Sequence, residues 1–279
     1  MEPQPTQLLT AAAAGDINAF QALFAEFQPA LKSYLYRLLT DRNDAEDLAH
    51  DTFIKAFDKL STFRGGASLK TWVFQIATHL AYDHLKARKR WPIDVKARGK
   101  ALCMSDAAVY GAIMRVHQAS GENAYDLKEH INHCFTCMGK TLPIEQQVAL
   151  ILKDIYDFSV KDIALILSKS ADVVKHLVQD ARHSLTDIFE SRCALVSKTG
   201  VCHQCSELNG LFNPKQDRQV ELNKLDLVKG SKRFDRAELL ALRTTLVKAI
   251  DPLRSSGADL QDILMRCDRV AIGELAAME

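Results

Sequence analysis

The stretch that decides the fold is D-A-E-D-L-A-H-D-T-F, residues Asp44–Phe53, which sets acidic side chains on a predicted helix. Leu48, Phe53, Ile54 and Phe57 recur at helical spacing, so the apolar residues face away from the carboxylates. Acidic residues in a first turn are also favoured by the helix dipole, and charged faces are usually just solvated. Taken alone, the stretch fits an ordinary solvated helix start. The flanking sequence decides between this interpretation and a functional acidic face.

Helical periodicity continues on both sides of this stretch. Upstream, apolar residues between Phe20 and Leu38 recur at steps of three and four, and Pro29 should bend or divide that helix. Downstream, residues 64–68 are expected to form a loop, and a helix is predicted from about Leu69 to Arg90. The sequence contains no strand alternation, βαβ unit or glycine-rich phosphate loop, so the predicted fold class is all-α.

The predicted helix after the loop combines aromatic and basic residues. Trp72, Gln75, His79 and Tyr82 lie along one side, and the helix ends in K-A-R-K-R-W, residues 86–91. Rings can stack on unpaired bases while cations follow phosphates, so this pattern suits single-stranded DNA. A core position for Trp72 is an equally good interpretation, because aromatic side chains usually bury.

In their order, these motifs resemble the second domain of extracytoplasmic-function (ECF) sigma factors. The match rests on D-A-E-D-L-x-x-D-x-F, then F-R-G at 63–65, W-V-F-Q-I-A at 72–77 and the basic helix end. The resemblance implies that the acidic helix binds the clamp helices of the polymerase β′ subunit, and that the loop and helix after it capture bases flipped from the minus-ten promoter element. His50 stands where the family usually has Gln.

Carried over residue by residue, the resemblance assigns three groups of contacts. The implied polymerase contacts are Asp44, Glu46, Asp47 and Phe53. The implied promoter contacts are Arg64, Ser68, Lys70, Trp72, Gln75 and His79. The implied DNA-backbone contacts are Lys86, Arg88, Lys89 and Arg90.

A second constellation predicts a helix-turn-helix. Ser159 can cap one amphipathic helix, residues 168–170 make a short turn, and a second amphipathic helix follows. An ordinary helical hairpin would give the same pattern. Together with Leu142-Pro143 and Ala181-Arg182, however, it resembles the fourth domain of the same family, which reads the minus-thirty-five element. The DNA-facing residues would be Lys175, His176, Gln179 and Arg182. Acidic Asp172 and Asp180 accompany them, so weak DNA binding by this helix alone is expected.

The cysteines form clusters and do not suggest a disulfide framework, because their number is odd. Two C-x-x-C pairs, Cys134/Cys137 and Cys202/Cys205, could close a tetrahedral zinc site, for which the rival ligands are Cys193, His133 and His203. Reversible thiol chemistry is a second interpretation. The cysteines could also simply pack as small hydrophobic residues.

Composition and length limit the class of protein and its domain organisation. With a hydrophobic fraction of 47% and a charged fraction of 25%, the chain is globular, and a net charge of +1 gives no overall basic field. The apolar runs are too short to span a membrane and the N-terminus lacks signal-peptide features, so a cytoplasmic protein is expected. The predicted organisation is a second sigma domain at 8–91, a linker at 92–127, a fourth domain at 128–192, a Cys-rich segment at 193–214 and a helical extension at 215–279.

These patterns favour an alternative sigma factor that catalyses no reaction. Its expected partners are promoter DNA and core RNA polymerase, through the β′ clamp helices and the β flap, and the sequence leaves open whether an anti-sigma factor binds it. One rival is a metal- or redox-sensing helix-turn-helix regulator that never joins polymerase, which would leave the acidic motif unexplained. A thiol-disulfide enzyme is disfavoured because no βαβ pattern accompanies the C-x-x-C pairs.

Overall fold

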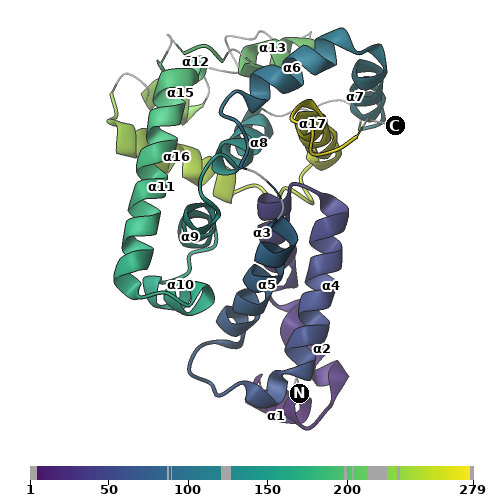
Figure 1. Cartoon of the computed structure of the whole chain (residues 1–279), viewed down its shortest axis with the longest axis vertical. Helices are drawn as coiled ribbons and strands as arrows, with labels where there is room; N and C mark the ends of the chain where they lie inside the picture. The colour runs from purple at the N-terminus through teal and green to yellow at the C-terminus, as the bar shows by residue number, and fades with distance from the viewer. Residues whose placement is uncertain are drawn as a thin grey trace.

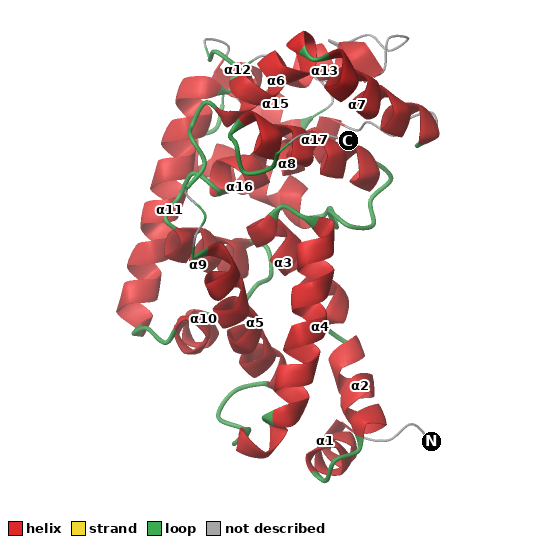
Figure 2. Cartoon of the chain, turned by 45° about the vertical axis from the view of Figure 1, so that its right-hand side comes forward, coloured by secondary structure: helices red, strands yellow, loops and turns green. Residues whose placement is uncertain are grey.

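The computed structural model describes residues 5–86, 88, 90–120, 127–197, 200–202, 204–212, 225–230 and 233–276. Helices dominate these residues (Figure 2). The only pairing of extended backbone among them is a single parallel bridge between Cys193 and Cys202. The all-α prediction is therefore confirmed.

The N-terminal bundle comprises α1 (Pro5–Ala13), α2 (Ile17–Ala25), α3 (Gln28–Leu39), α4 (Arg42–Asp58) and α5 (Leu69–Leu85), with a 3-10 turn at Leu60–Thr62. Pro29 lies in the first turn of α3, so the predicted long helix is divided there. Asp41 caps α4 and Ser68 caps α5, each accepting a backbone hydrogen bond. Helix α5 ends at Leu85, one turn earlier than predicted.

The segment predicted as a linker contains two helices, α6 (Val95–Ser105) and α7 (Ala107–Ala119). Both helices pack against α17, which is distant along the chain. The start of the segment is also fixed, since the Trp91 backbone N–H donates to the Lys140 carbonyl at 3.1 Å. Residues 92–127 therefore include ordered structure where the sequence suggested a flexible connection.

The helix-turn-helix block comprises α8 (Leu127–Gly139), α9 (Ile144–Asp154), α10 (Val160–Leu167) and α11 (Ala171–Arg192). Ser159 and Ser170 cap α10 and α11 through their side chains. Between them, Ser168 adopts a left-handed conformation with φ of 53° and closes the short turn. The predicted pair of amphipathic helices with a three-residue turn is confirmed.

The remaining helices are α12 (Ala194–Ser197), α13 (Gln204–Phe212), α15 (Asp226–Gly230), α16 (Arg236–Lys248) and α17 (Ala258–Ala271). Asp235 and Glu238 form a capping box at the start of α16. Helix α16 packs on α8 and α11, whereas α17 packs on α6, α7 and α8 and lies above the N-terminal bundle (Figure 1). The C-terminal extension, α15–α17, is thus built into the body of the protein.

None of the described helices is both long enough and apolar enough to cross a membrane.

Candidate polymerase and DNA interfaces

Helix α4 presents an acidic face to solvent. Ala45, Leu48, Ala49 and Thr52 are buried against the bundle, which turns Glu46, Asp47, His50 and Asp51 outward. Glu46 forms a salt bridge of 3.4 Å with Lys32, in which both side chains remain partly exposed. This face also carries an apolar side chain, since Ile54 is 43% exposed. A ridge of carboxylates beside exposed apolar surface suits a basic or mixed protein partner.

Two of the predicted polymerase contacts point inward. The Asp44 carboxylate pairs with Arg88 at 3.0 Å and His84 at 3.1 Å. The half-buried Phe53 ring lies 5.1 Å from Phe20 and 5.2 Å from Phe24, measured between centroids. In this structure both residues hold the bundle together, which leaves Glu46 and Asp47 as the exposed members of the predicted set.

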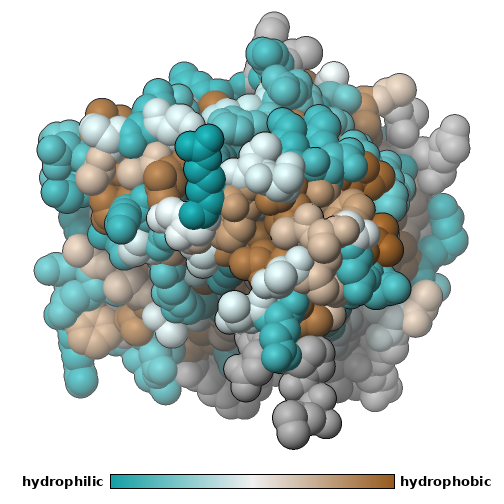
Figure 3. Space-filling model, turned by 90° about the horizontal axis from the view of Figure 1, so that it is seen from below, coloured by the Kyte–Doolittle hydropathy of each residue, from teal (hydrophilic) through white to brown (hydrophobic). Residues whose placement is uncertain are grey.

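Hydrophobic surface gathers at the end of the molecule that carries α1 and the loop before α5 (Figure 3). Arg64 and Ser68 of that loop are exposed, and so is His79 on α5. Trp72 is half-buried against Phe63, with ring centroids 5.4 Å apart. This position is compatible with both a core role and a contact with unpaired bases, because part of the residue packs inside while part stays exposed.

The remaining promoter candidates on α5 contact the helix-turn-helix block. Gln75 Nε2 donates to the Leu165 carbonyl at 2.9 Å, and Thr71 Oγ1 donates to Asp162 Oδ1 at 3.0 Å. Lys70 Nζ lies 4.9 Å from the Phe158 ring centroid. We call this packing of α5 on α10 the closed arrangement. It occupies part of the surface that the sequence assigned to DNA.

The basic end of α5 is only partly available. Lys86 and Arg90 are exposed, and Lys86 pairs with Asp83 at 3.1 Å. Arg88 is half-buried in its ion pair with Asp44, and Lys89 lies outside the described residues. The adjacent Trp91 is buried, and its indole N–H donates to Glu274 Oε1 at 2.8 Å. Of the predicted DNA-backbone contacts that the structure describes, Lys86 and Arg90 are therefore the exposed ones.

Helix α11 exposes all four predicted DNA-facing residues. Its opposite face is buried through Val174, Val178, Ala181, Leu185 and Phe189. Lys175 pairs with Asp172 at 2.9 Å, and Arg182 pairs with Asp154 at 2.5 Å. His176 and Gln179 lie between them along the exposed face. Intramolecular carboxylates thus neutralise both permanent cations, in agreement with the predicted weak electrostatic attraction.

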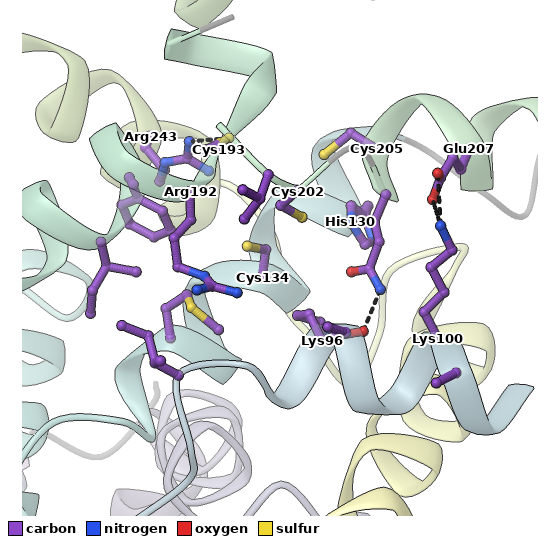
Figure 4. A pocket seen from close by; sticks show the side chains of 18 of the residues that line it. Lys96, Lys100, His130, Cys134, Arg192, Cys193, Cys202, Cys205, Glu207 and Arg243 are labelled. Carbon is purple, nitrogen blue, oxygen red and sulfur yellow. Dashed lines mark hydrogen bonds and ion pairs between the residues drawn. The ribbon is translucent and has the colours of Figure 1, made fainter. Parts of the chain in front are cut away.

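The structure gathers a different set of cysteines from the predicted one. Cys134, Cys193, Cys202 and Cys205 line one cavity of about 470 Å³, between α8, α11 and α13 (Figure 4). Burial raises the pKa of the Cys134 thiol to about 12 and that of Cys205 well above its usual range. None of the described cysteines forms a disulfide.

Cys137, which the sequence placed in the zinc set, lies instead against α17. Its Sγ is 3.4 Å from Asp268 Oδ2 and 3.6 Å from Met265 Sδ. Cys134 and Cys137 are three residues apart, so their side chains lie on neighbouring parts of one face of α8. Because α8 is buried on nearly every side, each thiol still meets a different neighbour. The rival ligand His133 lies with Cys137, and His203 is outside the described residues.

Around Cys137 lies a buried ionic cluster. Lys96 Nζ donates to Asp268 Oδ2 at 2.5 Å and also contacts His133 Nε2. Burial raises the pKa of Asp268, but Lys96 and His133 together lower it more and hold it below its usual range. Burial lowers the pKa of His133 to about 4. His133, Cys137 and Asp268 lie close enough together to hold a metal ion, but the Lys96 ammonium binds at this point.

Buried arginines form contacts that the sequence did not indicate. Arg37 of α3 donates to the Ile250 carbonyl at 2.9 Å and to Asn132 Oδ1 at 2.5 Å. Arg269 of α17 pairs with Asp41 at 2.6 Å. No sequence signal could have revealed these contacts, because a buried arginine and an exposed one look alike in an amphipathic pattern.

Comparison with known families matches the two blocks separately. Residues 23–91 match the Sigma-70 region 2 family, and residues 133–185 match the Sigma-70 region 4 family. These regions, in this order, define a sigma factor of the sigma-70 class. Residues 186–279 lie beyond both matches.

The relatives narrow the class. The chain is 27% identical to the RNA polymerase sigma-H factor of Pseudomonas aeruginosa over 66% of this chain and 93% of the relative. It is 26% identical to the ECF RNA polymerase sigma-E factor of Haemophilus influenzae over 61% of this chain and 87% of that protein. The chain belongs to the extracytoplasmic-function sigma factors.

Two solved structures are also similar. One is described as CnrH in complex with the cytosolic domain of CnrY, with 20% identity, a TM-score of 0.47, and coverage of 66% of this chain and 95% of that chain. The other is described as the sigma factor RpoE in complex with the anti-sigma factor NepR from Bartonella quintana. It has 24% identity and a TM-score of 0.43, and the match covers 61% of this chain and 96% of that chain.

Proposed function

We propose that this ECF sigma factor joins core RNA polymerase through the exposed acidic face of α4 and reads promoter DNA through α5 and α11. The observation that carries the proposal is the outward face of α4, on which Glu46, Asp47 and Asp51 are exposed while the opposite face is buried. The required partners are core polymerase and promoter DNA. The work is binding without bond-making, and it would take place in the cytoplasm, where polymerase and DNA are.

The proposed melting step depends on aromatic and polar groups near the start of α5. Unstacking a base step costs a few kcal/mol, and stacking on an aromatic ring returns about 1 to 3 kcal/mol per base. Trp72 and the adjacent Phe63 offer rings at this position, and exposed Arg64 and His79 offer polar contacts. Trapping an unpaired base there would make strand separation favourable.

The closed arrangement cannot read a whole promoter. The minus-ten and minus-thirty-five elements lie about 25 base pairs apart by their names, which is roughly 85 Å at 3.4 Å per base pair. In the closed arrangement, Thr71 of α5 and Asp162 of α10 are within hydrogen-bonding distance. Regions 2 and 4 therefore have to separate when the protein joins polymerase, and that separation exposes Gln75 for base contact.

The proposal is tested by charge reversal on α4. The double variant Glu46→Lys/Asp47→Lys should lose co-purification with core polymerase by at least about tenfold, because like charges across an interface are strongly unfavourable. The matched control is Asp83→Lys/Asp226→Lys, which makes the same change in net charge on exposed carboxylates elsewhere. Circular dichroism checks that both variants keep their helices. Core binding by the first variant at the wild-type level would refute the proposal, and a stand-alone DNA-binding regulator would give that result.

A further inference from the structure

We propose that Cys134, Cys193, Cys202 and Cys205 form a four-thiolate zinc site that fastens the segment after region 4 to helix α8. This inference goes beyond the proposed function, because neither polymerase binding nor promoter recognition uses these residues. It replaces Cys137 of the sequence-based set with Cys193.

The backbone brings the four cysteines around one cavity, and zinc binding would draw their sulfurs together, since no three of them lie mutually within 4.8 Å here. Cys193 follows the last residue of α11, and Cys205 lies in the first turn of α13. Between them the chain doubles back, since the Cys202 N–H donates to the Arg192 carbonyl at 2.8 Å and the Ala194 N–H donates to the Cys202 carbonyl at 3.2 Å. Cys202 and Cys205 make a C-x-x-C knuckle, a spacing that suits zinc.

A glycine makes this doubling back possible. A Cβ on Gly200 would lie 2.5 Å from the Arg192 carbonyl carbon and oxygen, and 2.8 Å from the Ala194 backbone nitrogen. These are backbone atoms that also form the bridge between Cys193 and Cys202, so they have little freedom to move. The close approach of the two cysteine-bearing strands of chain thus depends on the absence of a side chain at this position.

A buried cation beside the sulfurs is the second observation. Arg243 is only 2% exposed, its guanidinium lies 3.9 Å from the Phe189 ring centroid, and its Nη2 donates to Cys193 Sγ at 3.5 Å (Figure 4). Within the described part of the chain, no carboxylate forms an ion pair with it. A guanidinium stays protonated in proteins, and a buried charge needs a counter-charge.

A zinc tetrathiolate supplies that charge. Binding one Zn²⁺ releases the protons of four thiols and leaves a complex with a net charge of −2. Arg243 balances one of these charges, and Arg192, which lines the same cavity, is available for the other. Soft sulfur ligands select zinc or similar ions over magnesium and calcium.

The alternative metal site in this part of the protein is less suitable. His133, Cys137 and Asp268 are close together, but the ammonium of Lys96 already binds Asp268. That group is balanced as an ion pair without a metal, whereas Arg243 in the four-cysteine cavity has no carboxylate partner among the residues that the structure describes.

The test uses the full chain purified under a non-thiol reductant. Native mass spectrometry should find one zinc per chain in the wild type, and Co²⁺ substitution should give the ultraviolet charge-transfer bands of thiolate ligation. Cys193→Ser and Cys205→Ser should weaken zinc binding by about tenfold or more, since even outer-shell changes reach that size. The matched controls Cys137→Ser and Cys103→Ser should retain it.

Arg243→Gln separates ligation from folding. It leaves every proposed ligand in place, so it should keep a stoichiometry of one zinc while lowering the affinity. The wild-type cobalt spectrum reports sulfur ligation even if a cysteine variant fails to fold. A wild-type chain that carries no zinc and gives no Co²⁺–thiolate bands would overturn the proposal. Zinc loss in Cys137→Ser together with retention in Cys193→Ser would also do so.

Discussion

Gly99 of α6 lies directly against α17. A Cβ there would lie 2.1 Å from Asp268 Oδ1, and the ion pair with Lys96 holds that carboxylate in place. Gly99→Ala should therefore lower the free energy of unfolding by about 1–3 kcal/mol, as overpacking usually does. Urea unfolding measures this change.

At Gly111 of α7 the nearest atom is the mobile end of Arg115 at 3.4 Å, so Gly111→Ala should be neutral or stabilise by up to about 1 kcal/mol. Equal effects of the two substitutions would contradict the packing argument.

Lys140 predicts a pH dependence of stability. Its ammonium donates to the Leu38 carbonyl at 2.7 Å, and burial lowers its pKa from 10.5 to about 8 despite the nearby carboxylate of Glu274. Arg88 and Arg269 also disfavour the charged form. Between about pH 8 and 10.5 the unfolded chain binds more protons than the folded chain, so stability rises with pH in this window.

Lys140→Met provides the comparison. Between about pH 7 and pH 9, the free energy of unfolding of the wild type should rise by roughly 1 kcal/mol relative to the variant. Taking the difference at each pH removes the contribution of the cysteines, which titrate in the same range. Urea unfolding of both proteins at the two pH values measures it, and parallel pH profiles would show that the Lys140 pKa is not lowered.

Individual residues show where sequence reasoning reached its limit. The C-x-x-C spacings predicted metal chemistry, and the prediction of zinc remains to be tested, but spacing cannot say which way a helical cysteine points. Cys137 and Cys134 share a helix yet meet different neighbours because α17 and α13 lie on different sides of it. The partners of Asp44 were equally hidden, since its ion pair with Arg88 joins residues that are distant in sequence.

At the scale of elements, helices whose partners are near in sequence were predictable. The bundle α2–α5 and the pair α10–α11 have clear apolar stripes, caps and turns, and they form where these signals indicate. Helix α6 was taken for a linker because a lysine and a glycine, Lys96 and Gly99, stand on its buried face and give little apolar contrast. Helix α7 does bury an apolar stripe of Val109, Ala112 and Ile113, but its partner α17 lies more than half the chain away.

Helix α11 offers a test of DNA binding by an element that carries its own carboxylates. Asp172→Asn should release Lys175 for a phosphate contact, because the two are paired at 2.9 Å on an exposed surface. One added phosphate contact should steepen the dependence of log affinity on log salt by about one for promoter binding by the holoenzyme. Asp226→Asn removes a similarly exposed carboxylate in an equivalent pair and should leave the slope unchanged. An unchanged slope in Asp172→Asn would mean that Lys175 does not approach the phosphates.

For the whole molecule, the extension contacts both sigma regions at once. Toward region 2, Arg269 pairs with Asp41 at 2.6 Å, and the loop before α17 bonds to Ser33 through Asp251 at 2.6 Å. Toward region 4, α16 packs along α8 and α11 and pairs with α11 through Arg236. A single segment that contacts both region 2 and region 4 stabilises the state in which these regions are close together, which is the closed arrangement.

Arg269→Gln should therefore shift the protein toward open forms. The bond removed is a charge-assisted one worth on the order of 2 kcal/mol, which corresponds to a change of roughly 30-fold in the ratio of open to closed molecules. Small-angle X-ray scattering should show a larger radius of gyration, and the variant should bind core polymerase more tightly because less closed protein has to open. Arg236→Gln removes the same charge from a contact between α16 and region 4 alone, so it should leave core affinity nearer to that of the wild type. If Arg269→Gln loses thermal stability but keeps wild-type compactness and core affinity, the extension is only a structural support, and the closed arrangement is held by the α5–α10 contact itself.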